Sequence, residues 1–130
     1  MVKPNVVLAA CYGASNTGQL AGAIATELAK ENEGYSLVCL PAVATDKATG
    51  LDKIRGAGLL VVIEGCPIAC GTKIIEEHAK RKPDIEVDIV RDYGVKKAPT
   101  PAFAEAEKER IKRDVARLIK EKLAERGQGG

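Results

Sequence analysis

Four cysteines are the residues of this 130-residue sequence whose spacing points most directly to chemistry. Cys11, Cys39 and Cys66 each end or follow a short apolar run, and Cys70 comes four residues after Cys66. If a helix begins near Pro67, this spacing places the last two sulfurs on one helical face, with β carbons about 5–6 Å apart. Thiolates one turn apart can share a tetrahedral metal ion. We therefore expect a metal–thiolate site, with zinc as the favoured ion and iron as the alternative, because tetrahedral sulfur sites serve both.

The coordination of such a site depends on Cys39. Because Cys39 lies inside an apolar segment, it is either a ligand or an ordinary small core residue. Four thiolates would make a closed, structural or carrier-like site, whereas three thiolates and a water would leave an open, catalytic position. The sequence does not decide whether the chain is an enzyme, and it assigns no catalytic residue.

The same thiols also suit redox chemistry. In that alternative, Cys66 or Cys11 attacks a substrate or an oxidant, and Cys70 resolves the product as a disulfide. His78 is the only histidine and comes two turns after Cys70. We expect it to be a surface residue and not a ligand. Because no second histidine is available as a base, a cysteine hydrolase is not expected.

A second candidate site is the loop that follows the first apolar run. It contains Gly13, Ser15, Asn16, Thr17 and Gly18, whose backbone amides and side chains suggest weak binding of a small anion or a nucleotide. The loop lacks the lysine of a P-loop and the three-glycine spacing of the dinucleotide fingerprint. It resembles the cysteine loop of low-molecular-weight tyrosine phosphatases, but Thr17 stands where the phosphate-binding arginine is needed. The alternative is that the two glycines simply permit a tight strand-to-helix turn.

The elements that must position these residues alternate between strands and helices. Strands are predicted over residues 5–10, 35–40, 59–63 and 85–90, and helices over a segment beginning near residue 16 and over 46–55, 67–80 and 101–126. The continuous apolar run 59–63 indicates a strand buried on both faces. This order predicts a Rossmann-like, three-layer α/β/α domain with a mainly parallel, roughly four-stranded sheet. Because such sheets carry their functional loops at the carboxyl ends of the strands, Cys11, Cys39 and Cys66 should gather there.

Helix ends and apolar faces follow from local signals. Ser15 or Asn16 is the expected N-cap of the first helix, and Thr100 that of the last, with Pro101 in its first turn. The expected apolar faces of these two helices are Leu20, Ala23, Ile24 and Leu28, and Ile111, Val115, Leu118, Ile119 and Leu123. The charged face of the last helix is expected to be solvated. We predict a single domain over residues 1–126 and a disordered tail over 127–130.

Composition excludes several classes of protein. The formal net charge is +2, and the aromatic residues are three tyrosines and one phenylalanine with no tryptophan. Few aromatic side chains are therefore present to stack on bases, and we do not expect binding to nucleic acid. No apolar run approaches the ~20 residues of a membrane span, so no membrane association is expected. We expect a cytoplasmic protein, where thiols stay reduced; the sequence leaves its oligomeric state open.

Three motifs together resemble the DGC-domain family. They are Cys-Tyr-Gly-Ala-Ser-Asn-Thr-Gly-Gln at 11–19, Val-Cys-Leu-Pro at 38–41, and Val-Ile-Glu-Gly-Cys-Pro-Ile-Ala-Cys at 62–70. The resemblance extends over about residues 5–97 and leaves out the terminal helix. It implies a zinc-binding protein whose four cysteine ligands match Cys11, Cys39, Cys66 and Cys70.

Two positions depart from the family pattern. The Asp-Gly-Cys that names the family is Glu64-Gly65-Cys66 here, a change that keeps the carboxylate. Ala14 stands where some members carry a further cysteine, so metal affinity or redox behaviour should differ from theirs.

Overall fold

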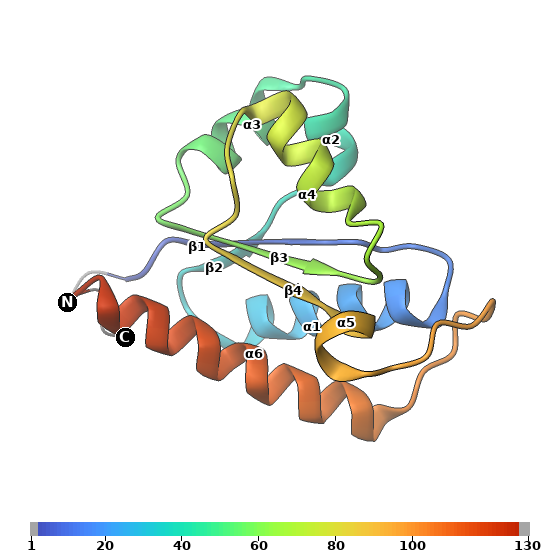
Figure 1. Ribbon diagram of the computed structural model, residues 1–130. Helices are drawn as coiled ribbons and strands as arrows, with labels where there is room; N and C mark the ends of the chain where they lie inside the picture. The colour runs from blue at the N-terminus through green and yellow to red at the C-terminus, as the bar shows by residue number, and fades with distance from the viewer. Residues whose placement is uncertain (1–2, 128–130) are drawn as a thin grey trace.

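The centre of the computed structural model, which describes residues 3–127, is a four-stranded parallel sheet (Figure 1). Its strands, in the order β2-β1-β3-β4, are β1 (Val6–Ala10), β2 (Tyr35–Leu37), β3 (Leu59–Glu64) and β4 (Ile85–Asp88). Every residue of the two central strands, β1 and β3, is buried. The predicted parallel α/β sheet is confirmed, and the double-sided burial explains the continuous apolar runs of β1 and β3.

Helices cover both faces of the sheet, as Figure 1 shows. One face packs against α1 (Asn16–Glu31), α5 (Ile89–Tyr93) and α6 (Glu105–Glu125). The other packs against α2 (Leu40–Ala44), α3 (Ala48–Arg55), and α4 (Cys70–Ile74) with the π-helical turn η1 (Ile75–Ala79) that continues it. None of the helices in this described part of the chain is long and apolar enough to cross a membrane.

Alternation along β1 builds two separate cores. Val6 and Leu8 belong to the core beneath α1 and α6, whereas Val7 and Ala9 belong to the core beneath α2 and α3. This division follows because successive side chains of a strand point to opposite faces.

Two strands end earlier than predicted, because the chain turns into short helices. β2 stops at Leu37, and Pro41 lies in the first turn of α2, where a proline loses no hydrogen bond. β4 stops at Asp88, whose carboxylate accepts hydrogen bonds from the amides of Val90 and Arg91 and so caps α5. Neither α2 nor α5 was predicted.

The ends of the long helices agree only in part with the prediction. Ser15 caps α1 as expected, and its hydroxyl accepts a hydrogen bond from the Gly18 amide. The last helix begins at Glu105, so Thr100 is not its cap; the Thr100 hydroxyl accepts from the Ala102 amide instead. The apolar faces agree with the prediction except at Ala23 and Leu118, which are only partly buried. Of the predicted tail, residues 128–130 lie outside the described part of the chain.

Part of the charged face of α6 packs on α1 instead of facing solvent. Lys108 is buried, and its ammonium pairs with Glu27 at 2.5 Å and with Glu105 at 2.7 Å. Lys112 pairs with Glu27 at 2.8 Å and with Glu31 at 3.1 Å. The hydrogen bonds from Lys108 and Lys112 lower the pKa of Glu27, although its partial burial acts in the opposite direction. This network fastens the terminal helix to the first one.

Asp84 joins the entry of β4 to the end of α6. Its carboxylate lies 2.9 Å from Arg126 and 3.0 Å from Arg81, and it accepts a 2.7 Å hydrogen bond from the Leu60 amide. Burial by itself would raise the pKa of Asp84, but the hydrogen bonds from Arg126 and Leu60 and the two arginine charges lower it below the ordinary 3.8.

Asp84→Asn should lower the free energy of unfolding at neutral pH by about 1–2 kcal/mol, because it removes charged hydrogen bonds that are partly shielded from water. A carboxyl with a lowered folded-state pKa stabilises the fold fully above its ordinary pKa, and this contribution is lost as the pH falls through the lowered value. The difference between wild type and variant should therefore shrink below about pH 4 in urea denaturation curves. Asp52→Asn, at an exposed position of α3, is the control. A difference that stays constant from neutral to acid pH would contradict this account.

Candidate functional site

The four cysteines lie near the carboxyl edge of the sheet, but in different local settings. Cys11 follows β1, and its amide donates to the Ile63 carbonyl at 3.2 Å, so it continues the pairing of the central strands. Cys66 lies in the turn between β3 and α4. Cys11 and Cys66 are both partly buried. Cys70 is the first residue of α4 and Cys39 precedes α2; both are exposed. All four thiols are free.

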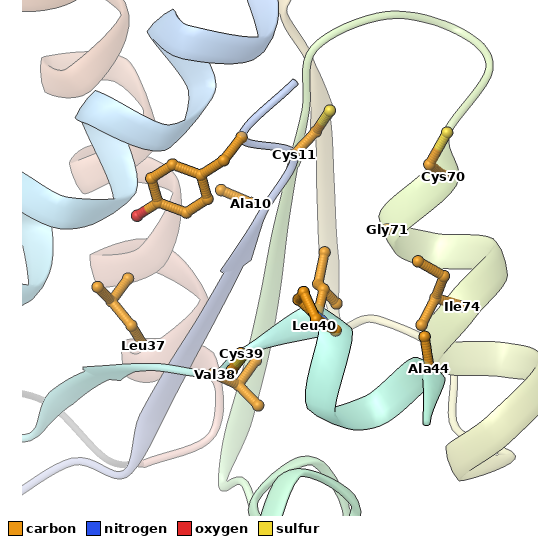
Figure 2. A pocket seen from close by; sticks show the side chains of 12 residues that line it. Ala10, Cys11, Leu37, Val38, Cys39, Leu40, Ala44, Cys70, Gly71 and Ile74 are labelled. Carbon is orange, nitrogen blue, oxygen red and sulfur yellow. The ribbon is translucent and has the colours of Figure 1, made fainter. Parts of the chain in front are cut away.

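Three of these cysteines, Cys11, Cys39 and Cys70, line one pocket of about 750 Å³. Figure 2 shows Cys11 and Cys70 at one end of it and Cys39 at the other. Cys66 does not line the pocket. The structure thus brings three of the four predicted residues to one cavity. It does not bring all four cysteines to a common centre, as the predicted metal site requires.

No three cysteine, histidine, aspartate or glutamate side chains within residues 3–127 lie close enough together to hold a metal ion. Four sulfur donors suit zinc chemically, but the arrangement does not match a tetrahedron with zinc–sulfur distances of about 2.3 Å. The four-cysteine ligand set therefore stays a prediction.

The register of the sheet explains why Cys39 lies apart. Leu37, the last paired residue of β2, pairs with Leu8, which comes three residues before Cys11, whereas Cys39 comes only two residues after Leu37. The chain then turns into α2 at Leu40. Cys39 is exposed, so it is not the core residue that its apolar neighbours suggested.

The helix after β3 begins at Cys70 and not near Pro67, so the predicted placement of Cys66 and Cys70 on one helical face is wrong. Ala69 adopts a left-handed conformation with φ 56°, which an α-helix excludes. The Ala69 amide donates to the Cys66 carbonyl at 3.1 Å, closing a turn. Cys66 therefore lies in this turn, outside the helix.

Glu64 determines where α4 begins. Its buried carboxylate accepts hydrogen bonds from the amides of Gly71, at 3.2 Å, and Thr72, at 2.6 Å. A β carbon at position 71 would lie 3.2 Å from a Glu64 oxygen, so glycine leaves room for this contact. Glu64 thereby positions Cys70 through the first turn of its helix. This role of Glu64 was not predicted; the signal in the sequence was an acidic residue at the end of a fully apolar strand.

The motif glycines pack three backbone segments together. A β carbon at Gly18 would lie 2.7 Å from Gly13, and one at Gly65 would lie 2.9 Å from Gly18. Such distances leave no space for a side chain. The loop after β1, the first turn of α1 and the turn after β3 are therefore held in direct contact.

The polar groups of the loop after β1 bind other parts of the protein. The Asn16 side chain donates to the Lys96 carbonyl at 2.9 Å and accepts from the Ala98 amide at 2.7 Å. Thr17 is fully buried, and its hydroxyl lies 3.2 Å from that of Ser15. These contacts and the glycine packing support the structural interpretation of the loop, and anion binding by its residues stays a prediction.

The segment that Asn16 holds brings a cation to Cys66. The Lys97 ammonium lies 3.6 Å from the Cys66 sulfur, and the sequence carried no signal for this pairing across 31 positions. His78 lies on η1, with Nδ1 at 2.9 Å from Asp46, and it does not line the pocket.

The family model of the DGC domain matches residues 7–115. The match contains all four cysteines and reaches into α6, further than the resemblance over residues 5–97 read from the motifs. No curated protein and no solved structure matches the chain significantly.

Glu64→Gln should lower the free energy of unfolding by about 1–3 kcal/mol, because the amide nitrogen cannot accept a hydrogen bond from a buried backbone amide. Urea denaturation measures the loss, and faster hydrogen exchange at Gly71 and Thr72 should locate it at the start of α4. Glu76→Gln, at an exposed position of η1, should leave both unchanged. Equal stability of the two variants would show that Glu64 does not hold this helix.

Proposed function

The chain belongs to the DGC-domain family, and from this premise we propose that it binds one zinc ion through thiolates, with Cys11, Cys39, Cys66 and Cys70 as the ligands. The observation that carries the proposal is the pocket shared by Cys11, Cys39 and Cys70. Cys66 joins them from the turn that precedes α4. Sulfur donors of this number and type are those that zinc prefers in proteins.

Zinc binding in this proposal requires part of the protein to move, because no three of the candidate side chains lie close enough together in this structure to hold a metal ion. The turn over residues 66–69 is the segment suited to move, because it lies between Gly65, which packs against Gly18, and the hydrogen bonds that hold α4. Cys39 has further to travel, since it lies at the other end of the pocket (Figure 2). Cys11, Cys66 and Cys70 are therefore the stronger ligands, and Cys39 decides whether the site is closed or open.

The four thiols are free, and ligand cysteines must stay reduced to bind metal. We therefore place the protein in the cytoplasm as part of this proposal.

Protein purified anaerobically, without an affinity metal column, should contain about one zinc ion per chain by elemental analysis, the occupancy of one thiolate site. Its thiols should become reactive toward a thiol reagent only after chelation, because coordinated sulfur is protected. Metal-free protein with four reactive thiols would overturn the proposal.

Single cysteine-to-serine variants should separate the ligands. Cys11→Ser, Cys66→Ser and Cys70→Ser should each lower zinc affinity strongly. Cys39→Ser should keep stoichiometric zinc if the site is open and lose affinity similarly if it is closed. Unchanged affinity in all four variants would show that any bound zinc lies elsewhere.

A second candidate function is thiol–disulfide exchange, and the contact between Lys97 and Cys66 favours it. The ammonium at 3.6 Å from the sulfur is a charge partner for a thiolate, which is the attacking species in exchange. The Cys66 and Cys70 thiols would give up two electrons and two protons to a disulfide substrate, which would leave as two thiols. Cys66 would form the mixed disulfide and Cys70 would resolve it; if Cys11 attacks instead, Cys11 and Cys70 are the two thiols that are oxidised.

Lys97→Met should slow the alkylation of Cys66 by iodoacetamide in metal-free, reduced protein, because the positive charge beside the sulfur is lost. Mass spectrometry of the digested protein measures each cysteine separately. Lys96→Met is a matched control at an exposed neighbouring position; only the Lys96 carbonyl contacts Asn16. Equal rates at Cys66 in both variants and the wild type would remove the reason for this candidate.

A further inference from the structure

The pocket beside the cysteines has the dimensions of a site for an organic molecule. Its volume of about 750 Å³ lies within the roughly 300–1,000 Å³ of small-molecule sites. A zinc ion with four ligands needs only a small fraction of this space. Most of the pocket is therefore unexplained by metal binding.

The walls of the pocket are apolar and come from three elements. Leu37 and Val38 extend from the end of β2, Leu40 and Ala44 belong to α2, and Ile74 belongs to α4. Figure 2 shows Ile74 across the pocket from Leu40, with Ala44 beside them. Water in contact with these walls is unfavourable, and an apolar occupant would release it.

No aspartate, glutamate, lysine, arginine or histidine is among the described residues that line the pocket. A charged ligand would lose its hydration here without gaining an ionic partner, which is costly. The lining residues whose side chains carry a polar group are Cys11, Cys39, Cys70 and Tyr12. This composition selects for a molecule without charge and with few hydrogen-bonding groups.

Tyr12 is also among the residues that line the pocket, and its aromatic ring is held by contacts with α1. The Tyr12 side chain is 53% exposed, although its hydroxyl lies 2.5 Å from that of Thr26. A β carbon at Gly22 would lie 2.3 Å from the ring, so α1 packs closely against it. An exposed ring tethered at both its face and its hydroxyl is available for contact with an apolar ligand.

We propose that this pocket is a binding site for a neutral, largely apolar organic molecule of small size, which contacts Leu37, Leu40 and Ile74 and lies against the thiols. The proposal goes beyond zinc binding and does not depend on it, because Leu37, Leu40 and Ile74 are not among the proposed zinc ligands.

The test is a fluorescence titration of the full chain, kept reduced and treated with a chelator, with the neutral dye N-phenyl-1-naphthylamine. Wild type should give a saturable, blue-shifted increase in emission. Ala44→Phe fills part of the pocket and should raise the Kd about tenfold, because several dye atoms lose their contacts. Ala106→Phe makes the same exchange at an exposed position of α6 and should bind the dye as wild type does.

Ile74→Lys provides a second variant, because position 74 is partly exposed and its new charge can reach water. It should also weaken dye binding, and circular dichroism should show that each variant is folded. Absence of saturable binding by wild type would overturn the proposal, as would equal affinity of folded Ala44→Phe, Ile74→Lys and Ala106→Phe. Because the protein is free of metal throughout, a failure here is distinct from a failure to bind zinc.

Discussion

Gly13, Gly18 and Gly65 bring three backbone segments into direct contact at the carboxyl edge of the sheet, and the positions of Cys11 and Cys66 depend on this contact. A β carbon at Gly18 or Gly65 would lie within 3 Å of a neighbouring backbone, a distance that packed atoms do not tolerate. The two central strands supply the base for it, since Ala10 pairs with Ile63 immediately before the loops begin. The glycine motif is therefore a packing device that places two cysteine-bearing segments side by side.

Glu64 extends this arrangement from the sheet to α4. A buried carboxylate is costly unless its oxygens are hydrogen-bonded, and here both accept bonds from the first turn of the helix. The acidic residue of the family motif thus has a structural task, which is to set the start of the helix that carries Cys70. The intervening turn, which contains Cys66, is left between two fixed points. Such a turn can present its thiol to Lys97 or turn it toward the other cysteines, and the proposed redox and metal functions differ in which of these occurs.

The pocket gives the thiols a setting unlike that of a compact structural zinc site. Cys11, Cys39 and Cys70 border an apolar cavity instead of being enclosed by one another. Cys39 and Cys70 stay exposed to solvent, but the apolar residues beside the cysteines influence both metal affinity and thiol reactivity. Because Cys11, Cys39 and Cys70 line the cavity, the proposed metal and ligand sites adjoin one another.

The sequence was enough to predict the parallel α/β sheet, a cap of α1 at Ser15 or Asn16, and most of the apolar faces of α1 and α6, because these depend on local periodicity and on capping chemistry. Tertiary structure alone decided the start of α4, the separation of Cys39 from Cys11 and the approach of Lys97 to Cys66. The start of α4 depends on a buried carboxylate, Glu64, seven residues before Gly71. The position of Cys39 depends on where β2 ends and turns into α2. Lys97 approaches Cys66 because Asn16 holds its segment, 80 residues further along the chain. Contacts between residues so distant in sequence arise only when the whole chain packs, and no spacing along the chain encodes them.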